Sequence, residues 1–303
     1  MTSPTTPDRP ESWPPLPIDS WEATRATLHM WTQIVGKIRL RLTPLVNQWW
    51  NVTLYVTARG LTTSRIPYHD RAFEIWFDFI AHELVLETSD GQVRKLPLGP
   101  RTVSEFYREV MEMLRSAGID VKIWTMPVEI PNPIPFEQDH THASYDRTAV
   151  ENFWRILLSA DAVLGEFRSL FIGKCSPVHF FWGSFDLAVT RFSGRRAPDK
   201  PGADFVTKEA YSHEVSSVGF WPGNAGVIDA AFYSYAAPEP AGFKEAGVRP
   251  AQASYNKQIG EFILMYEDVR RAGSPSAALL DFCQSTYEAA ANLANWDRKA
   301  LER

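Results

Sequence analysis

The sequence predicts an α+β fold made of two pseudo-repeated halves, each a helix, an antiparallel β-meander and a second helix, with a ligand pocket between them. Two patterns predict this fold class. Apolar residues recur at helical spacing in several long segments, and strand-like segments of alternating character lie grouped between those helices. The order helix, strands, helix occurs twice, and short identities in register, such as Gly36-Lys37 and Gly173-Lys174, indicate an internal repeat.

The composition is that of a soluble globular protein with enough apolar residues for a large core. Hydrophobic residues make up 45% of the 303 residues and charged residues 22%. A formal charge of -5 argues against a nucleic-acid partner, which requires a concentrated basic surface. No apolar run approaches the roughly 18 residues of a membrane span, and the two cysteines have no metal or disulfide spacing. We therefore expect a cytoplasmic protein that binds neither membranes nor nucleic acid.

The first half is expected over residues 19–130, after a proline-rich arm. Residues 1–18 contain six prolines and no periodic pattern, which predicts a disordered arm. Asp19 and Glu22 form a capping-box-like start for a helix that ends near Gly36. The alternation of side chains predicts strands, and a period of 3.6 predicts a helix. The predicted elements are strands over 49–60, 72–87 and 93–98, a helix over 102–117 and a strand over 121–130.

A proline-broken crossover over residues 131–146 leads to the second half, residues 147–303. Thr148 and Glu151 are expected to cap its first helix, which ends near residue 171. The segments that follow are predicted as strands over 179–192, 211–221 and 230–240, a helix over 256–273, and a long C-terminal helix that begins at Ser274 and Pro275.

The first strand of the second half is the densest group of candidate site residues. Gly183 indicates a β-bulge that would shift the alternation and bring Asp186 to the same side as His179. Ionisable groups held among aromatic residues suit acid–base chemistry, because apolar surroundings shift their pKa values. We therefore predict His179, Asp186 and His213 as catalytic residues. The alternative is structural, with a histidine bonded to a backbone carbonyl and an aspartate paired with a neighbouring arginine.

Two arginines and three aromatic residues are predicted to bind the ligand. Arg191 lies inside the strand pattern and Arg59 is its counterpart in the first half, and a guanidinium group matches the geometry of a carboxylate or phosphate. Tyr55 shares a face with Arg59. Trp182 and Trp221 are expected to line the pocket, Trp221 at the start of a loop rich in glycine and proline. The predicted ligand is a small, partly apolar anion, although a strand face exposed to water remains the alternative for Arg59.

Metal and nucleotide motifs are missing from the sequence. His140 and His142 in the crossover, and Glu214 beside His213, are weak candidates for metal ligands, since no HExxH or paired-cysteine motif occurs. No GxxxxGK[ST], GxGxxG or GxSxG pattern is present either. We therefore predict no cofactor, with a metal-dependent form of the enzyme as the open alternative.

Four sequence blocks are distinctive: WPPLP, WTQIVGKIRL, SPVHFFWGSFDLAVTRFSGRRAP and ANWDR. They resemble the blocks of a bacterial family catalogued only as a domain of unknown function, number 5996. The resemblance covers nearly the whole chain after the proline-rich arm. It implies no activity, no cofactor and no site residues.

Two classes of function remain open from the sequence. The first is a nucleotide-independent enzyme, a lyase, isomerase or hydrolase, which acts by acid–base chemistry on a small anionic, partly apolar molecule. The second is a binding or carrier protein whose pocket performs no chemistry. A structural protein that binds a partner through exposed apolar strips is a third, less favoured possibility.

Overall fold

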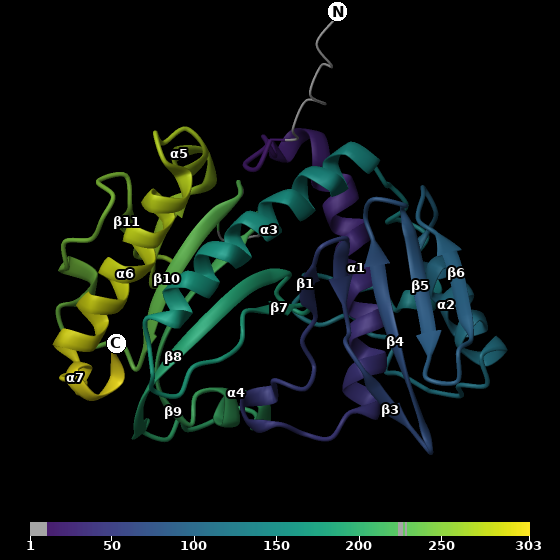
Figure 1. The fold of residues 1–303 in the computed structure, drawn as a ribbon, viewed down its shortest axis with the longest axis horizontal. Helices are drawn as coiled ribbons and strands as arrows, with labels where there is room; N and C mark the ends of the chain where they lie inside the picture. The colour runs from purple at the N-terminus through teal and green to yellow at the C-terminus, as the bar shows by residue number, and fades with distance from the viewer. Residues whose placement is uncertain (1–10, 224–226, 228) are drawn as a thin grey trace, which may run out of the picture.

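The chain folds into two six-stranded antiparallel sheets that meet at their edges (Figure 1). The computed structural model describes residues 11–223, 227 and 229–303. The sheets are joined where Leu54 and Phe180 exchange two backbone hydrogen bonds of 2.9 Å each. The fold is therefore α+β, as the sequence predicts. No helix in the described part of the chain is long and apolar enough to cross a membrane.

The first sheet is formed by short strands around a longer central pair. Its order is β1-β2-β4-β5-β6, and β3 also pairs with β4. The alternation predicted for β4 is confirmed, because Phe73, Ile75 and Phe77 are buried while Glu74 and Trp76 between them are partly exposed. The strands are β1 (Tyr55–Thr57), β2 (Gly60–Thr62), β3 (Ile66–Tyr68), β4 (Arg71–Asp78), β5 (Glu83–Thr88) and β6 (Val93–Pro97).

Helices α1 (Ile18–Leu42) and α2 (Val103–Ser116) belong to this half, and each begins differently. Thr102 and Glu105 form a reciprocal capping box at the start of α2. The capping box predicted at Asp19 and Glu22 is wrong. Helix α1 instead begins after Pro17 without a side-chain cap, and Glu22 pairs with Arg25 at 2.7 Å.

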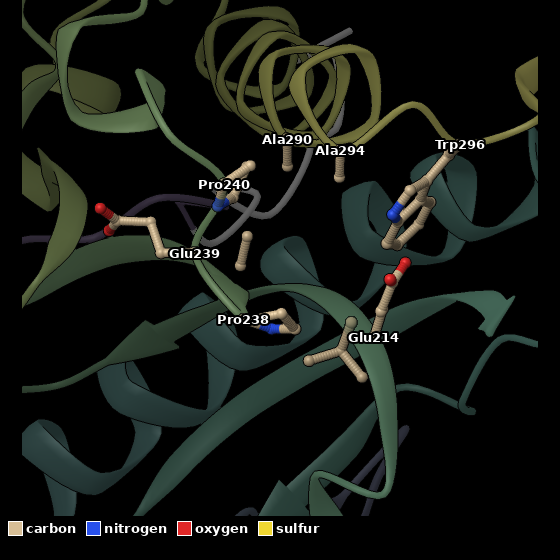
Figure 2. A pocket seen from close by; sticks show the side chains of 9 residues that line it. Glu214, Pro238, Glu239, Pro240, Ala290, Ala294 and Trp296 are labelled. Atoms are coloured by element: carbon tan, nitrogen blue, oxygen red, sulfur yellow. The ribbon is translucent and has the colours of Figure 1, made fainter. Parts of the chain in front are cut away.

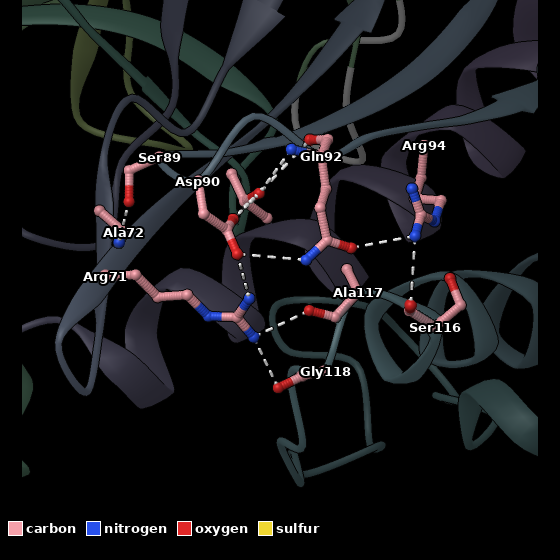
Figure 3. Close-up of polar contacts among 10 residues, drawn as sticks. Arg71, Ala72, Ser89, Asp90, Gln92, Arg94, Ser116, Ala117 and Gly118 are labelled. Carbon is pink, nitrogen blue, oxygen red and sulfur yellow. Dashed lines mark hydrogen bonds and ion pairs between the residues drawn. The ribbon is translucent and has the colours of Figure 1, made fainter.

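A polar network fastens the strands of the first sheet to the end of α2 (Figure 3). The guanidinium group of Arg71 donates to the carbonyls of Ala117 and Gly118, both at 2.8 Å, and to Asp90 at 3.1 Å. Because the last carbonyls of a helix lack partners within the helix, Arg71 satisfies groups that would otherwise need water.

The predicted strand over residues 121–130 is wrong, because that segment lies outside both sheets. Side chains of α1 bind its backbone instead. Gln33 donates to the carbonyl of Val128 at 2.8 Å and accepts from its amide at 2.9 Å, and Lys37 donates to the carbonyl of Met126 at 2.7 Å. These contacts replace the hydrogen bonds of a sheet.

The second sheet has the order β11-β12-β10-β9-β8-β7, and helices α3 and α6 cover one of its faces (Figure 1). Asp146 caps α3 by accepting from the amide of Ala149 at 2.8 Å, so the predicted cap by Thr148 and Glu151 is wrong. The strands are β7 (His179–Phe181), β8 (Asp186–Arg196), β9 (His213–Trp221), β10 (Ala231–Ala237), β11 (Ser254–Asn256) and β12 (Glu261–Met265).

The helices of the second half differ in length. The longest are α3 (Arg147–Ser169) and α6 (Pro275–Leu293), and α6 starts after Ser274 with proline in its first position, as predicted. Three short helices are α4 (Phe205–Ala210), α5 (Tyr266–Arg270) and α7 (Arg298–Leu301). Short 3₁₀ turns are η1 (Asn47–Trp49), η2 (Phe136–Gln138) and η3 (Phe243–Glu245).

Two elements of the second half differ from prediction. The single strand predicted over 179–192 is a hairpin, because residues 182–185 form a turn in which Phe185 has a φ of 59°. The helix predicted over 256–273 is strand β12 followed by the short helix α5. A run of apolar residues such as Phe262–Leu264 is buried on both faces, and its periodicity does not separate strand from helix.

The proline-rich segment that precedes α1 packs against the second half. The carbonyl of Pro14 accepts from the hydroxyl of Tyr266 at 2.6 Å, and Trp13 meets the ring of Phe232 edge-on at 6.4 Å. Residues 11–17 therefore depart from the predicted disordered arm, because Trp13 fills part of the core. Residues 1–10 of the predicted arm lie outside the described residues.

Candidate functional site

A cavity of about 840 Å³ opens on the face of the second sheet that points away from α3 and α6. Alternate residues of β8 face it, namely Asp186, Ala188 and Thr190, whereas Leu187 and Val189 belong to the main core on the other face. Residues 48–50, 52 and 128–129, the turn after β7, helix α4 and parts of β9 and β10 also belong to the lining. Ten aromatic residues line it: Trp49, Trp50, Phe181, Trp182, Phe192, Phe205, Tyr211, Trp221, Tyr233 and Tyr235.

Asp186 is the most deeply buried acidic residue of the cavity. The turn over residues 182–185 places it at the start of β8, where it is 4% exposed. Ser184 and Tyr233 each donate a hydrogen bond to one oxygen of its carboxyl group. Burial raises the pKa of Asp186 to about 6, although both hydrogen bonds favour the ionised form.

A glycine allows Tyr233 to reach Asp186 from two strands away. Tyr233 lies opposite Gly219 on β9, and Gly219 in turn lies opposite Ala188 on β8. A Cβ atom on Gly219 would lie 2.4 Å from the Tyr233 hydroxyl and 2.6 Å from the carbonyl oxygen of Leu187. The phenol therefore crosses β9 over a position where no side chain fits.

Glu261 is the second carboxyl group of the cavity, at the start of β12. Its Oε2 atom is buried and has no hydrogen-bond partner among the residues that the structure describes. Burial is the main reason that the pKa of Glu261 rises to about 7, and the negative charge of Asp186 adds to the shift. This carboxyl group therefore holds a proton up to nearly neutral pH.

Glu129 lies at the rim, in the segment that α1 fastens through Gln33. It is an exposed residue with a φ of 56°, and its side chain lies against Gly183, where a Cβ would come within 2.5 Å of its Oε1 atom. Loss of water around the carboxyl group raises the pKa of Glu129, and the charge of Asp186 raises it further. Three carboxyl groups with raised pKa values thus share one cavity.

Helix α1 supports the turn that carries Asp186. The Nε2 atom of His29 lies 3.0 Å from the carbonyl oxygen of Trp182 and 2.9 Å from that of Gly183. Its ring stacks on Phe185 with 4.7 Å between centroids. Burial lowers the pKa of His29 to about 4, so the neutral ring donates its one Nε2 proton toward these carbonyls.

The aromatic residues are fixed by stacking and by hydrogen bonds. Trp221 stacks on Tyr233 at 4.2 Å, and the hydroxyls of Tyr211 and Tyr235 lie 3.2 Å apart. The indole nitrogen of Trp182 donates to the carbonyl of Val52 at 2.7 Å. These residues form a rigid and mainly apolar lining of the kind found in small-molecule sites.

Of the predicted site residues, Asp186, Trp182 and Trp221 line the cavity. His179 faces the same side of the sheet as Asp186, because its partner in β8 is Ala188. Its side chain is fully buried behind the cavity lining, with centroid distances of 5.9 Å to Trp50 and 5.5 Å to Phe181.

Two further predicted residues, Tyr55 and His213, lie outside the cavity lining. The hydroxyl of Tyr55 lies 3.5 Å from the Nε2 atom of His179. Burial lowers the pKa of His179 to about 3, which keeps the ring neutral. His213 begins β9, where its Nδ1 atom lies 3.0 Å from the hydroxyl of Ser212.

The two predicted anion-binding arginines also lie elsewhere. Arg191 points to the opposite face of β8, where its guanidinium group lies 3.5 Å from the ring centroid of Phe167 and 4.3 Å from that of Tyr287. Arg59 bonds to Asp78 in the first sheet at 2.7 Å. Strand alternation explains the first placement, since residues 186 and 191 differ by an odd number. The predicted convergence of these arginines with Asp186 is not found.

The candidate metal ligands are dispersed. His142 pairs with Asp139 at 2.7 Å, Glu214 pairs with Arg195 at 2.7 Å, and His140 is exposed. Within residues 11–223, 227 and 229–303, no three His, Cys, Asp or Glu side chains are grouped closely enough to hold a metal ion.

A smaller hollow of about 210 Å³ lies where the end of β10 meets α6 (Figure 2). Glu214, Glu239 and Trp296 surround it together with prolines and alanines. Glu214 is already paired with Arg195 on the surface. The larger cavity is therefore the stronger candidate site.

Several cavity residues were not predicted from the sequence: Glu129, Tyr211, Tyr233, Tyr235 and Glu261. Tyr233 and Tyr235 alternate with Phe232 and Ser234, a period of two that places both tyrosines on one face. This alternation in the sequence is enough to place both tyrosines on the same face of a strand. Glu261 lies in the segment that the sequence assigns to a helix, so its strand face could not be deduced.

The fold and the cavity together define the class of protein, an α+β protein with a large aromatic cavity that contains buried carboxyl groups. The sequence profile of one family, described as "Family of unknown function (DUF5996)", matches residues 13–303. The chain belongs to this family. No curated protein and no solved structure is significantly similar to it.

Proposed function

We propose that this protein is a nucleotide-independent enzyme that binds a small, partly apolar molecule in the cavity and transfers protons with Asp186 and Glu261. One observation carries the proposal: the buried Asp186 and the half-buried Glu261, with pKa values raised to about 6 and about 7, line the same aromatic cavity. Strongly shifted pKa values in a concave apolar site are typical of catalytic acids and bases.

The two carboxyl groups are suited to different roles near neutral pH. Asp186, with the lower pKa and two hydrogen-bond donors, is mainly ionised and can accept a proton. Glu261, with the higher pKa, is about half protonated at pH 7 and can donate one. Elimination, isomerisation and hydrolysis all require such a pair, so the proposal covers lyase, isomerase and hydrolase chemistry.

The nature of the ligand departs from the sequence-based expectation. An anionic substrate was expected because of Arg191 and Arg59, and both guanidinium groups lie outside the cavity lining. The proposal therefore retains a small, partly apolar molecule without the requirement for a negative charge.

The proposal extends to the organisation and location of the protein. Each half has a six-stranded antiparallel sheet, which supports descent from a duplicated unit. Residues from the first half, such as Trp49 and Trp50, and residues of the second sheet line the cavity together, which supports a ligand pocket between the halves.

The acidic composition and the free cysteines Cys175 and Cys283 support a bacterial cytoplasmic protein that binds neither nucleic acid nor membranes.

The test compares the wild-type protein with Asp186→Asn and with Asp70→Asn as a control on an exposed turn. Each protein is incubated with a small-molecule extract of bacterial cells, and mass spectrometry follows every compound with time. We expect the wild type and the control to convert a compound, and Asp186→Asn to do so about 100-fold more slowly or worse. Equal conversion by all three proteins would reject the role of Asp186, and no conversion by the wild type would reject the enzymatic role.

A binding or carrier protein is the second candidate. The observation that favours it is that both oxygens of Asp186 already accept hydrogen bonds from Ser184 and Tyr233, an arrangement that orients a ligand-binding carboxylate. Native mass spectrometry of the purified protein separates the two candidates. A carrier retains one unchanged molecule and converts nothing in the extract.

A further inference from the structure

The charge of the cavity determines which ligands it can bind. Four of the described residues that line it carry carboxyl groups, namely Glu129, Asp186, Asp204 and Glu261, and Asp204 also caps α4. None of the described residues that line it is Lys, Arg or His. The acidic groups therefore face the same space without a positive side chain among them.

Two lysines contact the outer side of the aromatic lining. The Nζ atom of Lys174 lies 4.6 Å from the ring centroid of Phe192 and donates to Gln48 at 2.7 Å. Lys37 lies 6.0 Å from the ring centroid of Trp182 and donates to the carbonyl of Met126. Both ammonium groups thus already donate hydrogen bonds to other residues, and neither lysine lines the cavity.

We infer that the cavity binds an organic cation, with a protonated amine between the carboxyl groups of Glu261 and Asp186 and an apolar body against Trp221, Tyr233 and Tyr235. The inference rests on the proposed function only in taking the cavity to be a ligand site. The partnerless Oε2 atom of Glu261 provides the acceptor for an ammonium hydrogen. The negative faces of the surrounding rings attract cations as well.

Other ligand charges fit less well. A carboxylate or phosphate would be repelled by these acidic groups in a site of low dielectric constant. A neutral alcohol could bond to the protonated form of Glu261, but it would not offset the negative charges of Asp186 and Glu129. A cation offsets these charges and therefore lowers the pKa of Asp186 and Glu261 when it binds.

The test uses three matched compounds with the same aromatic body: tryptamine, the alcohol tryptophol and the acid indole-3-acetate. Phenethylamine, 2-phenylethanol and phenylacetate form a second set. Isothermal titration calorimetry at pH 7.5 measures binding to the wild-type full-length protein. We expect the amine of at least one set to bind about ten-fold or more tightly than its alcohol, since a charge-assisted hydrogen bond is worth at least this ratio.

Two variants locate the preference. Glu261→Gln is expected to remove most of the amine preference, whereas Glu112→Gln, on the exposed side of α2, is expected to retain it. Circular dichroism shows whether both variants are folded. A folded Glu261→Gln protein that keeps the full amine preference would overturn the role of that residue.

Proton release provides a second measurement. At pH 6.5 the carboxyl group of Glu261 is mainly protonated, and binding of a cation should release about half a proton or more. Calorimetry of the tightest amine in two buffers of different ionisation enthalpy measures this number. Proton uptake or no exchange would contradict the inference.

The outcomes separate the inference from the proposed function. If the alcohols or acids bind as tightly as the amines, the cavity is a ligand site but the cation inference is wrong. If no compound of either set binds at millimolar concentration, the inference falls, and the proposed function then depends on the conversion experiment alone.

Discussion

The hydroxyl of Tyr233 on β10 donates a hydrogen bond to the carboxyl group of Asp186 on β8, across the strand that separates them. A side chain at position 219 of that strand would block the path, because its Cβ would lie 2.4 Å from the Tyr233 hydroxyl. The environment of Asp186 therefore depends on Gly219, although this residue has no side chain. The packing that Gly219 allows sets both the pKa and the orientation of the Asp186 carboxyl group.

Gly219→Ala is expected to destabilise the protein and to disturb Asp186. The new methyl group meets both the phenol of Tyr233 and the backbone carbonyl of Leu187 at 2.6 Å, and the backbone cannot easily move. Overpacking of this kind costs about 1–3 kcal/mol. Urea unfolding at pH 7.5 measures the loss.

Gly165→Ala is the matched control for this substitution. Gly165 lies inside α3, and a Cβ there would meet nothing within 4 Å. Alanine should therefore stabilise the protein by about 0.5–1 kcal/mol, because glycine is unfavourable within a helix. If both variants shift the unfolding midpoint in the same direction, the steric role of Gly219 is refuted.

Arg71→Ala is expected to lower the free energy of unfolding by about 1–3 kcal/mol, because the carbonyls of Ala117 and Gly118 lose a charged donor (Figure 3). The control is Arg65→Ala, an exposed arginine of the same half, which should change stability by less than about 0.5 kcal/mol. Thermal unfolding followed by circular dichroism compares the two. Equal losses would show that the contacts of Arg71 contribute nothing specific.

His29→Ala should destabilise the turn that carries Asp186, by about 2–4 kcal/mol at pH 7.5. The substitution leaves a space beside Phe185 and removes the donor for the carbonyls of Trp182 and Gly183. Denaturant unfolding measures this difference. The exposed His140→Ala serves as the control and should behave like the wild type.

The effect of His29→Ala should depend on pH. In the folded protein the pKa of His29 is lowered from 6.5 to about 4, so the unfolded chain binds a proton first as the pH falls. The stability contributed by the neutral ring is present above pH 6.5 and is lost between pH 6.5 and 4. The difference between wild type and variant should therefore shrink by about 2–3 kcal/mol from pH 7.5 to pH 4.5. A constant difference would show that His29 titrates normally.

Local patterns in the sequence predict the elements whose two faces differ. Strand β4 is an example, since Phe73, Ile75 and Phe77 alternate with partly exposed residues. Strand β12 is the opposite case, because Phe262–Leu264 is buried on both sides and has no polar face to reveal its period. The fold class follows from the first kind of segment, and the misassigned helix over 256–273 contains the second.

The candidate site was predicted only in part for a related reason. Asp186, Trp182 and Trp221 lie in segments predicted as strands, and all three line the cavity. Glu129 enters the cavity through a segment that is held by Gln33 of α1, a residue far away in the chain. No local pattern encodes such a contact. Arg191 is a different case, since the alternation of β8 alone places it on the face opposite Asp186.

Glu261→Gln is expected to stabilise the protein relative to the wild type by an amount that grows as the pH rises from 4.5 to 8. The carboxyl group has a pKa of 4.5 in the unfolded chain and about 7 in the folded protein, so the folded state holds the extra proton between these values. Its contribution to stability is complete below pH 4.5 and is lost as the pH rises through 7. Glutamine cannot ionise, so the variant should gain about 1–3 kcal/mol over the wild type between pH 6 and pH 8.

Urea unfolding at pH 6, 7 and 8 measures this gain, with the exposed Glu112→Gln as a control that should run parallel to the wild type. His29 and His179 titrate in both proteins alike and cancel from the comparison. Parallel curves for Glu261→Gln and wild type would mean that this carboxyl group is ionised at ordinary pH, and the proton-donor role proposed for it would then be excluded.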